Sequence, residues 1–307
     1  MMRSLEYQGV KTMFGYPGGS IMPTFDALYG HRDKLNHILV RHEQGAAHAA
    51  QGFARSSGEV GVCLVTSGPG VTNTITGIAD AMIDSTPIVV IAGQTPTSLL
   101  GTDAFQEVDL VGITQPISKW SYQIRSAKDV AWAVARAFYI AKSGRPGPVV
   151  LDFTKNAQTE MVDYEPMKVD FIRSYDPIPD TDRVELQHAA DLINNAERPL
   201  VLGGQGVELG NAQEELCSFL EKADIPCGRT LLGLSAIPTD HPLNKGMLGM
   251  HGNLAPNVKT NECDVLIAVG MRFDDRVTGN LETYARQAKI VHMDIDPSEI
   301  NKNVKVD

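Results

Sequence analysis

The sequence of 307 residues is long enough for two domains that each bury a core of their own. Its composition, with 43% hydrophobic and 21% charged residues, is that of a globular protein, and its formal net charge of −10 argues against nonspecific binding to nucleic acid, which needs a basic surface. The absence of a signal peptide, of a long uncharged stretch and of paired cysteines predicts a cytoplasmic protein with no membrane contact, zinc site or disulfide framework.

The first half of the chain alternates short apolar runs with longer amphipathic segments. This pattern is typical of βαβ units around a parallel sheet, because buried parallel strands are continuously aliphatic and their crossover helices are apolar on one face. The predicted strands are Val10–Phe14, His37–Val40, Gly61–Thr66, Ile88–Ala92 and Val149–Phe153. The predicted helices are Gln44–Arg55, Val71–Ile83 and Lys128–Ser143. We therefore expect residues 1–158 to form one α/β domain.

A polar, proline-spaced stretch without periodicity follows, and we interpret residues 159–183 as a linker. A second α/β pattern covers residues 184–307. Its predicted helices are Val184–Asn195 and Ala212–Lys222, and its predicted strands are Pro199–Gly203, Asp264–Gly270 and Ile290–Ile295. This pattern has fewer units than the first and no closing helix, so we expect a second doubly wound parallel-sheet domain that is truncated at its C-terminus.

Polar and glycine-rich segments come directly after predicted strands of the first domain. The glycines of Gly15–Ser20 would let the backbone approach a ligand, or would simply form a tight turn. Glu43 stands where a helix begins, and an enclosed carboxyl there can exchange a proton, although the helix dipole alone also favours an acid at this position. We expect His42 and His48 to be core or hydrogen-bonding histidines, because no third metal ligand has a suitable spacing.

Two further segments are placed in the same way. Thr66–Asn73 closes the third strand and opens a helix with free N–H groups, but it lacks the Gly-Lys-Ser/Thr ending of a Walker loop. Gly101–Glu107 follows the fourth strand and combines an amide and acids with an aromatic ring. Because the carboxyl ends of parallel strands meet at one edge of a sheet, these segments predict a shared pocket at that edge.

Taken together, these motifs and their order resemble those of acetolactate synthase catalytic subunits, which depend on thiamine diphosphate. The matching segments are Tyr-Pro-Gly-Gly from Tyr16, Arg-His-Glu-Gln-Gly-Ala from Arg41, Thr-Ser-Gly-Pro-Gly-Val-Thr-Asn from Thr66, Gly-Thr-Asp-Ala-Phe-Gln-Glu from Gly101, Gly-Arg-Pro-Gly-Pro-Val from Gly144 and Arg-Phe-Asp-Asp-Arg-Val-Thr-Gly from Arg272. The resemblance covers nearly the whole chain. It implies a pyrimidine-binding domain followed by a Rossmann-like, FAD-binding middle domain that is incomplete.

By this resemblance, Glu43 matches the glutamate that hydrogen-bonds the pyrimidine ring of thiamine diphosphate and favours its imino tautomer. Phe105 and Gln106 match the wall on the substrate side, with Gln106 a candidate donor to developing negative charge on an oxygen. Lys155 matches a lysine near the active-site entrance. The positions that match the surroundings of the pyrimidine are Tyr16, Gly19, Thr66, Pro69 and Asn73.

The second domain matches the part of the family that binds FAD. Glycines after a strand suit the close approach of a dinucleotide, and Arg272 and Arg276 can neutralise its pyrophosphate, although a surface cluster of ion pairs is an alternative interpretation of Arg-Phe-Asp-Asp-Arg. The matching positions are Arg145, Gly203, Gly204, Gln205, Thr230, Leu231, Met250, His251, Gly270, Arg272, Asp274, Arg276, Val277, Asp294, Ile295 and Glu299.

The implied reaction decarboxylates pyruvate and condenses the hydroxyethyl intermediate with a second 2-keto acid, pyruvate or 2-ketobutyrate, in the biosynthesis of valine and isoleucine. The resemblance also implies a homodimer or a larger assembly and is compatible with a regulatory small subunit. The family's magnesium (Mg2+) ligands belong to a third domain that this sequence does not contain. We therefore expect no metal ligands in this chain and little activity from it alone.

Two alternatives stay open. The first is another thiamine-diphosphate decarboxylase or oxidase of the same architecture, such as pyruvate oxidase or glyoxylate carboligase. Glu43 argues against glyoxylate carboligase, whose corresponding residue is not acidic, and the segment Gly101–Glu107 favours acetolactate synthase over the oxidase. The second is a non-catalytic FAD-binding module, which the missing third domain makes plausible.

Overall fold

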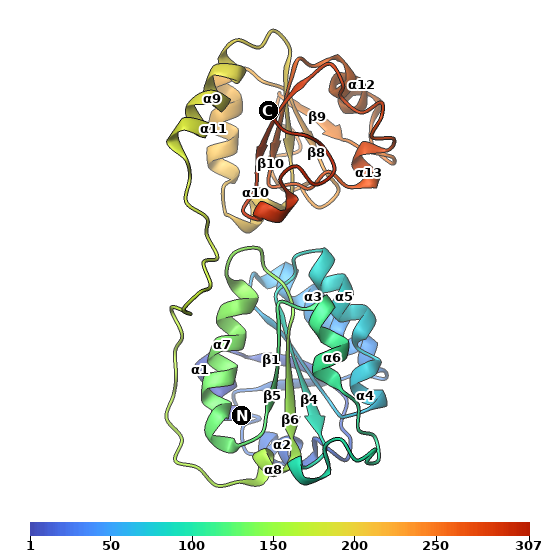
Figure 1. Cartoon of the computed structure of the whole chain (residues 1–307), viewed down its shortest axis with the longest axis vertical. Helices are drawn as coiled ribbons and strands as arrows, with labels where there is room; N and C mark the ends of the chain where they lie inside the picture. The colour runs from blue at the N-terminus through green and yellow to red at the C-terminus, as the bar shows by residue number, and fades with distance from the viewer. The chain divides into compact units, whose positions relative to one another are not determined.

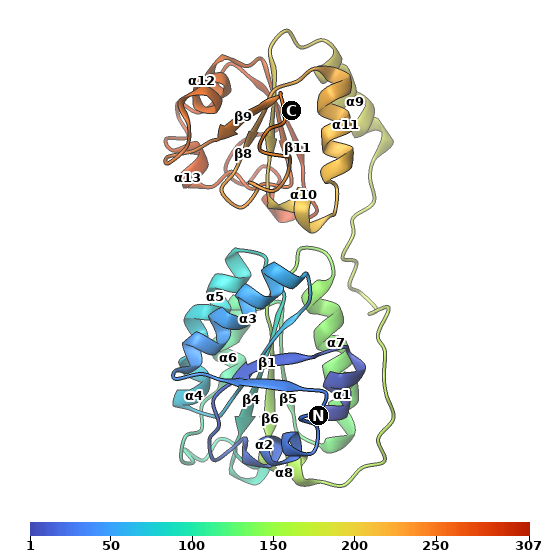
Figure 2. The same ribbon diagram turned by 180° about the vertical axis from the view of Figure 1, so that it is seen from behind.

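Two separate parallel sheets organise the chain in the computed structural model, which describes residues 1–307 (Figure 1). The residues divide into two units, Met1–Pro177 and Ile178–Asp307, each built on one of the sheets with helices on both of its faces (Figures 1 and 2). The predicted fold class of two doubly wound α/β domains is therefore confirmed. None of the helices combines the length and the apolar character that are needed to cross a bilayer.

The sheet of the first unit has six strands in the order β2-β1-β3-β4-β6-β5. They are β1 (Thr12–Gly15), β2 (Asn36–Leu39), β3 (Gly61–Val65), β4 (Ile88–Gln94), β5 (Trp120–Ile124) and β6 (Val149–Thr154). The inner strands β3, β4 and β6 are buried along their whole length, as their aliphatic sequences predict. Strand β5 is not among the predicted strands, because this edge strand is mostly half-buried and mixes polar with aromatic residues.

Helices cover both faces of this sheet. They are α1 (Met2–Tyr7), α2 (Met22–Tyr29), α3 (Glu43–Ser57), α4 (Pro69–Thr72), α5 (Ile75–Ile83), α6 (Leu110–Thr114), α7 (Val130–Lys142) and α8 (Lys155–Thr159). The helices α1, α2 and α7 pack on one face, with Leu5 and Leu28 in its core. The helices α3, α5 and α6 pack on the other face, with Ala46 and Ile78 in its core (Figures 1 and 2).

The prediction of one continuous helix over Val71–Ile83 is wrong, because the chain breaks between α4 and α5. Thr74 is fully buried at the break, and its hydroxyl donates to the carbonyl oxygen of Val71 at 2.7 Å. Such a bond from a side chain to the backbone competes with the helical pattern. The neighbouring Asn73 directs its side-chain amide to Glu43. Asn73, at this break, therefore connects the segment that starts at Thr66 with Glu43 of the segment that starts at Arg41.

Part of the polar stretch after α8 packs on the first unit. Ile172 is buried in its core and forms an antiparallel bridge with Tyr175. The ammonium group of Lys119 donates to the Tyr175 hydroxyl at 3.1 Å and to the carbonyl oxygen of Ser143 at 2.6 Å. Burial lowers the pKa of Lys119 to about 8. The division between the two units falls inside the stretch 159–183.

The sheet of the second unit has five strands in the order β11-β10-β7-β8-β9. They are β7 (Pro199–Gly203), β8 (Cys227–Arg229), β9 (Asn244–Met247), β10 (Val265–Val269) and β11 (Lys289–Met293). The helices are α9 (Arg183–Asn194), α10 (Gln205–Leu209), α11 (Gln213–Ala223), α12 (Leu254–Glu262) and α13 (Asp275–Thr278). The predicted strands β7, β10 and β11 and the predicted helices α9 and α11 are confirmed. The short strands β8 and β9, each with an internal glycine, are not among the predictions.

Each sheet changes its winding direction at one pair of neighbouring strands. In the first unit the chain leaves β1 toward α2 on one face and leaves the adjacent β3 toward α4 and α5 on the other. In the second unit it leaves β7 toward α11 on one face and leaves the adjacent β10 toward α13 on the other. Loops that diverge from adjacent strands open a crevice at the carboxyl ends, where open α/β sheets bind their ligands.

Candidate functional sites

The crevice of the first unit contains a carboxyl group that is almost fully enclosed. Glu43 is the first residue of α3, and only 9% of it is exposed. The side-chain amide of Asn73 donates to its Oε2 at 2.9 Å. A Cβ atom on Gly70 would lie 3.5 Å from its Oε1. The carboxyl group therefore has one amide partner, and its other oxygen faces a backbone without a side chain.

The two histidines near Glu43 are hydrogen-bonded, as predicted. The Nδ1 atom of His42 accepts from the backbone N–H of Gln44 at 3.1 Å and so caps the N-terminus of α3. The Nδ1 atom of His48 lies 3.2 Å from the side-chain amide of Gln51. No three histidine, cysteine, aspartate or glutamate residues gather anywhere in the chain in a way that could hold a metal ion.

The loops after β1 and β3 contact each other in front of Glu43. The backbone N–H of Ser20 donates to Thr66 Oγ1 at 3.3 Å, and the hydroxyl of Ser67 donates to that of Ser20 at 2.8 Å. Cβ atoms on Gly18 and Gly70 would lie 2.5 and 2.6 Å from the methyl group of Thr66. Gly18 is therefore needed for the β1 loop to pack against the β3 loop, which the alternative of a simple tight turn does not explain. Gly70 is needed for the β3 loop to fold back on its own Thr66.

The predicted residues of these two loops differ in exposure. Thr66 is buried, while Tyr16, Gly19 and Pro69 are exposed. A Cβ atom on Gly19 would meet no atom within 4 Å. The structure thus brings the predicted segments after β1, β2 and β3 into one crevice, with Glu43 enclosed and with Tyr16, Gly19 and Pro69 toward solvent.

The loop after β4 joins the same crevice through Gln106. This residue has a left-handed backbone with φ of 57°, and a Cβ atom on Gly68 would lie 2.7 Å from its carbonyl oxygen. Phe105 beside it is 87% exposed. Lys155 begins α8 at the carboxyl end of β6, is exposed, and makes no ion pair or hydrogen bond through its side chain. The structure therefore brings Gln106 against the β3 loop and leaves Phe105 and Lys155 in solvent.

A glutamate within this loop shapes it. The carboxylate of Glu107 accepts from the backbone N–H groups of Gly101 and Ala104, the latter at 3.1 Å. These backbone donors lower the pKa of Glu107. Asp103 and Gln106 both have positive φ angles, so the loop is a tight, internally bonded turn.

The predicted positions of the second unit all lie at the carboxyl end of its sheet. Thr230 donates its backbone N–H to Gly203 at 3.0 Å, and Met250 donates to the carbonyl of Arg276 at 2.8 Å. Gly203 ends β7, and Gly204 and Gln205 follow it. Thr230 and Leu231 follow β8, and Met250 and His251 follow β9. The residues after β10 are Gly270, Arg272, Asp274, Arg276 and Val277, and those after β11 are Asp294, Ile295 and Glu299.

The glycines at the β7 and β10 ends pack backbone on backbone. The N–H of Gly204 donates to the carbonyl of Val269 at 2.9 Å, and the N–H of Gly206 donates to that of Gly270 at 2.8 Å. A Cβ atom on Gly204 would lie 2.2 Å from the carbonyl oxygen of Gly270. These glycines are thus required by the contact between the two loops. The sequence assigns them to the approach of a dinucleotide, a role that this packing does not exclude.

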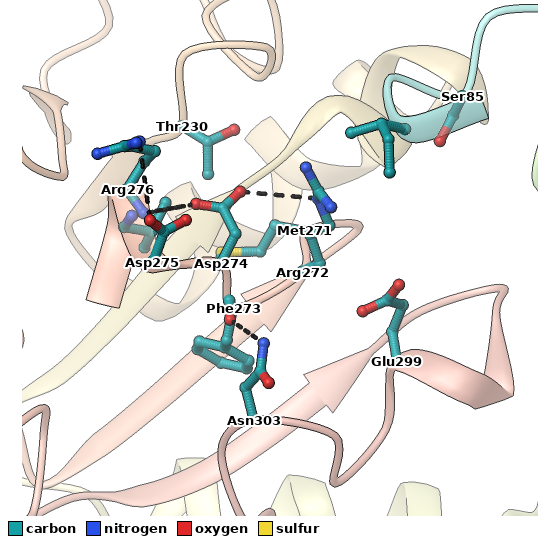
Figure 3. Close-up of polar contacts among 12 residues, drawn as sticks. Ser85, Thr230, Met271, Arg272, Phe273, Asp274, Asp275, Arg276, Glu299 and Asn303 are labelled. Carbon is teal, nitrogen blue, oxygen red and sulfur yellow. Dashed lines mark hydrogen bonds and ion pairs between the residues drawn. The ribbon is translucent and has the colours of Figure 1, made fainter. Parts of the chain in front are cut away.

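The loop after β10 carries two arginines on a fixed backbone (Figure 3). The carboxylate of Asp274 caps α13 by accepting from the N–H of Arg276 at 2.9 Å, and it lies 3.6 Å from the guanidinium of Arg272. Arg276 lies 3.8 Å from Asp275, and its side chain is 68% exposed. These contacts agree in part with the ion-pair interpretation, but they are long and leave both guanidinium groups able to bind an anion.

Two side chains hold this loop from beneath. Asn303 donates to the carbonyl oxygen of Phe273 at 2.8 Å, as Figure 3 shows. His292 Nε2 lies 2.8 Å from the carbonyl oxygen of Met271. The backbone on both sides of Arg272 is therefore fixed. Arg145, which the resemblance groups with these residues, belongs to the first unit and donates to the hydroxyl of Ser85 at 2.8 Å.

One polar group of the first unit is not among the predicted site residues. Asp152 is 1% exposed in the middle of β6, and Gln94 is equally buried at the end of β4. The signal in the sequence is a single acid within the aliphatic run Val149–Phe153. Its partners come from separate strands, so the sequence does not show what the acid contacts.

Comparisons with known proteins match both units. The family profile described as thiamine pyrophosphate enzyme, N-terminal TPP binding domain, matches residues 1–113. The profile described as thiamine pyrophosphate enzyme, central domain, matches residues 186–307. Together they cover most of the chain.

Curated relatives are similar along the whole chain. The probable acetolactate synthase large subunit of Methanocaldococcus jannaschii is 50% identical, in an alignment that covers 100% of this chain and 52% of the relative. The acetolactate synthase isozyme 2 large subunit of Escherichia coli K12 is 47% identical over 98% of this chain and 54% of its own length. The acetolactate synthase large subunit of Corynebacterium glutamicum is 46% identical over 100% of this chain and 49% of its own length. The chain spans about half the length of the curated relatives it matches.

Proposed function

Because this chain belongs to the thiamine pyrophosphate enzymes, through their N-terminal and central domains, we propose that it carries out the cofactor-holding part of an acetolactate synthase reaction. The observation that carries the proposal is the placement of Glu43. Glu43 is only 9% exposed, near the point where the loops after β1 and β3 leave in opposite directions. Its carboxyl group has one amide partner, Asn73. A carboxyl group enclosed in this way can hold a proton at a fixed position against a ligand.

The residues around Glu43 fit the aminopyrimidine of thiamine diphosphate. Glu43 Oε1 accepts no hydrogen bond within the chain and can pair with a ring nitrogen. Gly19 offers backbone without a side chain, and a Cβ atom there would meet no other atom within 4 Å. A flat ring can lie against such a backbone segment, because no Cβ atom projects toward it. Asn73 fixes the orientation of the Glu43 carboxyl through its 2.9 Å hydrogen bond.

The chain's own residues then have distinct tasks. Thiamine diphosphate, when bound, supplies the electron sink that the decarboxylation of a 2-keto acid requires. Glu43 holds or releases a proton at its free oxygen, which sets the protonation state of the ring that it contacts. Gln106, held in a left-handed backbone against Gly68, is a side-chain amide donor for an oxygen that gains negative charge. Pyruvate and 2-ketobutyrate are the proposed 2-keto acids.

We propose FAD as the ligand of the second unit. The residues fit an anionic dinucleotide, because Arg272 and Arg276 stand at the carboxyl end of β10 on a backbone fixed by Asp274 and Asn303. Two guanidinium groups on one short loop can bind the two phosphates of a pyrophosphate. Such a ligand would lie where β7 and β10 diverge, the usual place for dinucleotides in open α/β sheets.

We further propose that the remainder of the catalytic centre comes from the part of the relatives that this chain does not span. No three histidine, cysteine, aspartate or glutamate side chains gather in the chain in a way that could hold a metal ion, so we propose that ligands of the magnesium that accompanies the diphosphate come from that part as well. A homodimer, and a regulatory subunit beside it, are proposed partners by the same resemblance.

A chimera tests the proposal. Residues 1–307 replace the matching part of the Methanocaldococcus jannaschii relative, and acetolactate formation from pyruvate is measured with thiamine diphosphate, Mg2+ and FAD. We expect activity in the chimera and a loss of roughly 100-fold or more in Glu43→Gln, because a positioned proton-transfer group contributes about that much. Glu59→Gln is the matched control, since this glutamate is exposed in the turn after α3.

The outcome against the proposal is equally clear. A folded chimera that binds FAD but forms no acetolactate would support a non-catalytic FAD-binding module. A chimera in which Glu43→Gln keeps the activity of Glu59→Gln would remove Glu43 from the mechanism.

A further inference from the structure

An acid stands in the middle of an aliphatic strand, in the core of the first unit. Asp152 is 1% exposed on β6, between the fully buried Leu151 and the 2% exposed Phe153. In the register of the sheet it lies beside Ala92 of β4 on one side and Gln123 of β5 on the other. A buried charge is costly unless other groups compensate it, so its contacts require an explanation.

Two side-chain amides meet at one oxygen of this carboxyl group. The Nε2 atom of Gln123 donates to Asp152 Oδ2 at 2.7 Å, and the Nε2 atom of Gln94 lies 3.4 Å from the same oxygen. The other oxygen, Oδ1, has no hydrogen-bond partner. The charged groups closest to Asp152 are Asp109, the N-cap of α6, and Arg125, which follows β5.

Gln94 connects this carboxyl group to both ends of the loop that follows β4. Its Nε2 atom donates to the carbonyl oxygen of Val108 at 3.0 Å, and its Oε1 atom accepts from the backbone N–H of Thr95 at 2.9 Å. Thr95 is the first residue of the loop, and Val108 lies just before α6. One side chain therefore fixes the distance between the two ends of the loop.

Both oxygens of a carboxylate can only accept hydrogen bonds, which suits two converging amide donors. Ionised aspartate only accepts hydrogen bonds, whereas asparagine and glutamine carry both donors and acceptors and can turn over. The carbonyl oxygen of Val108 can only accept and the N–H of Thr95 can only donate, so both backbone partners require this orientation of the Gln94 amide. Asp152 adds an acceptor on the inner side of the same amide and so reinforces the orientation.

We propose that Asp152 is a positioning residue, which sets the conformation of residues 95–109 by orienting Gln94. The loop carries Phe105 and Gln106 and contacts the β3 loop through Gly68. The claim that it faces a substrate rests on the proposed function. The claim that Asp152 holds it in place does not, and it can be tested without cofactor or substrate.

Hydrogen–deuterium exchange on the intact 307-residue chain is the test. In Asp152→Ala both glutamine amides lose their acceptor, and we expect amides of residues 95–109 to exchange at least roughly tenfold faster. Gln94→Ala should reproduce this pattern. Asp152→Asn keeps an oxygen for the two amides and should restore most of the protection. Asp152→Leu fills the space without offering an acceptor and should not restore it.

Val150→Ala is the matched control, because this residue is fully buried on the same strand and offers no hydrogen-bond acceptor to either glutamine. It should speed exchange across β4 and β6 without a selective effect on the loop. The proposal is overturned if Asp152→Ala speeds exchange in the loop no more than Val150→Ala does, or if the asparagine variant behaves like the alanine variant. Neither result would bear on Glu43, so the two proposals fail separately.

Discussion

Replacement of Asp152 by asparagine should stabilise the first unit at neutral pH. Burial raises the pKa of Asp152 to about 6, from an ordinary value of 3.8. The amides of Gln123 and Gln94 act in the opposite direction and lower this pKa. Of the charged neighbours, Asp109 raises the pKa and Arg125 lowers it. Because the pKa is higher in the folded than in the unfolded chain, the stability that Asp152 contributes is fully present below pH 3.8 and is lost as the pH rises through about 6. A shift of roughly two pKa units corresponds to about 3 kcal/mol.

Urea unfolding of the native chain and of Asp152→Asn between about pH 4 and pH 8 measures this difference. Tryptophan fluorescence reports on the first unit alone, because Trp120 and Trp132 are the two tryptophans of the chain. We expect the variant to be about 3 kcal/mol more stable at pH 8, and the difference to vanish toward pH 4. A difference that is independent of pH, or a variant that is less stable at pH 8, would refute the conclusion that Asp152 carries a buried charge.

Two further substitutions test the loop contacts. Gly68→Ala should lower the free energy of unfolding of the first unit by roughly 2 kcal/mol, because Gly68 has φ of 57° and a Cβ would lie 2.7 Å from the Gln106 carbonyl oxygen. Gly19→Ala is the control and should be close to neutral, since a Cβ there meets open space. Equal effects of the two substitutions in urea unfolding would contradict this packing. Asp274→Ala should lose the N-cap of α13, worth about 1 kcal/mol, and speed exchange of its amides about fivefold, whereas Asp275→Ala should leave them unchanged.

The sequence predicts the inner strands well because their burial is visible in their composition. Ile88–Gln94 and Val149–Thr154 are mostly apolar, and both are buried throughout. Strands β8 and β9 carry no such signal, since each is short and interrupted by glycine. The break at Thr74 is also invisible from periodicity, because it depends on a buried hydroxyl bonding to the backbone of its own turn.

The candidate site divides in the same way. That Glu43 lies near Asn73 could be expected, because both follow strands whose carboxyl ends share one edge of a parallel sheet. The packing of Gly18 and Gly70 against Thr66, and of Gly204 against Gly270, could not be expected from the sequence. A glycine after a strand looks the same in the sequence whether it faces a ligand or packs against backbone. Only the three-dimensional structure distinguishes the two.

The position of each crevice follows from topology more than from any motif. In both units the first strand has neighbours on both sides, β2 and β3 around β1 and β8 and β10 around β7, so the chain must reverse its direction of travel there. A right-handed crossover then sends the loops of two adjacent strands to opposite faces. Glu43 and Asn73 meet at one such point, and Gly204 and Gly270 meet at the other. Substitutions that alter the proposed catalysis or the proposed FAD binding should therefore concentrate on the loops that leave β1, β3, β7 and β10. Asp152 matters because, by our proposal, it fixes the loop that lies next to the first of these points.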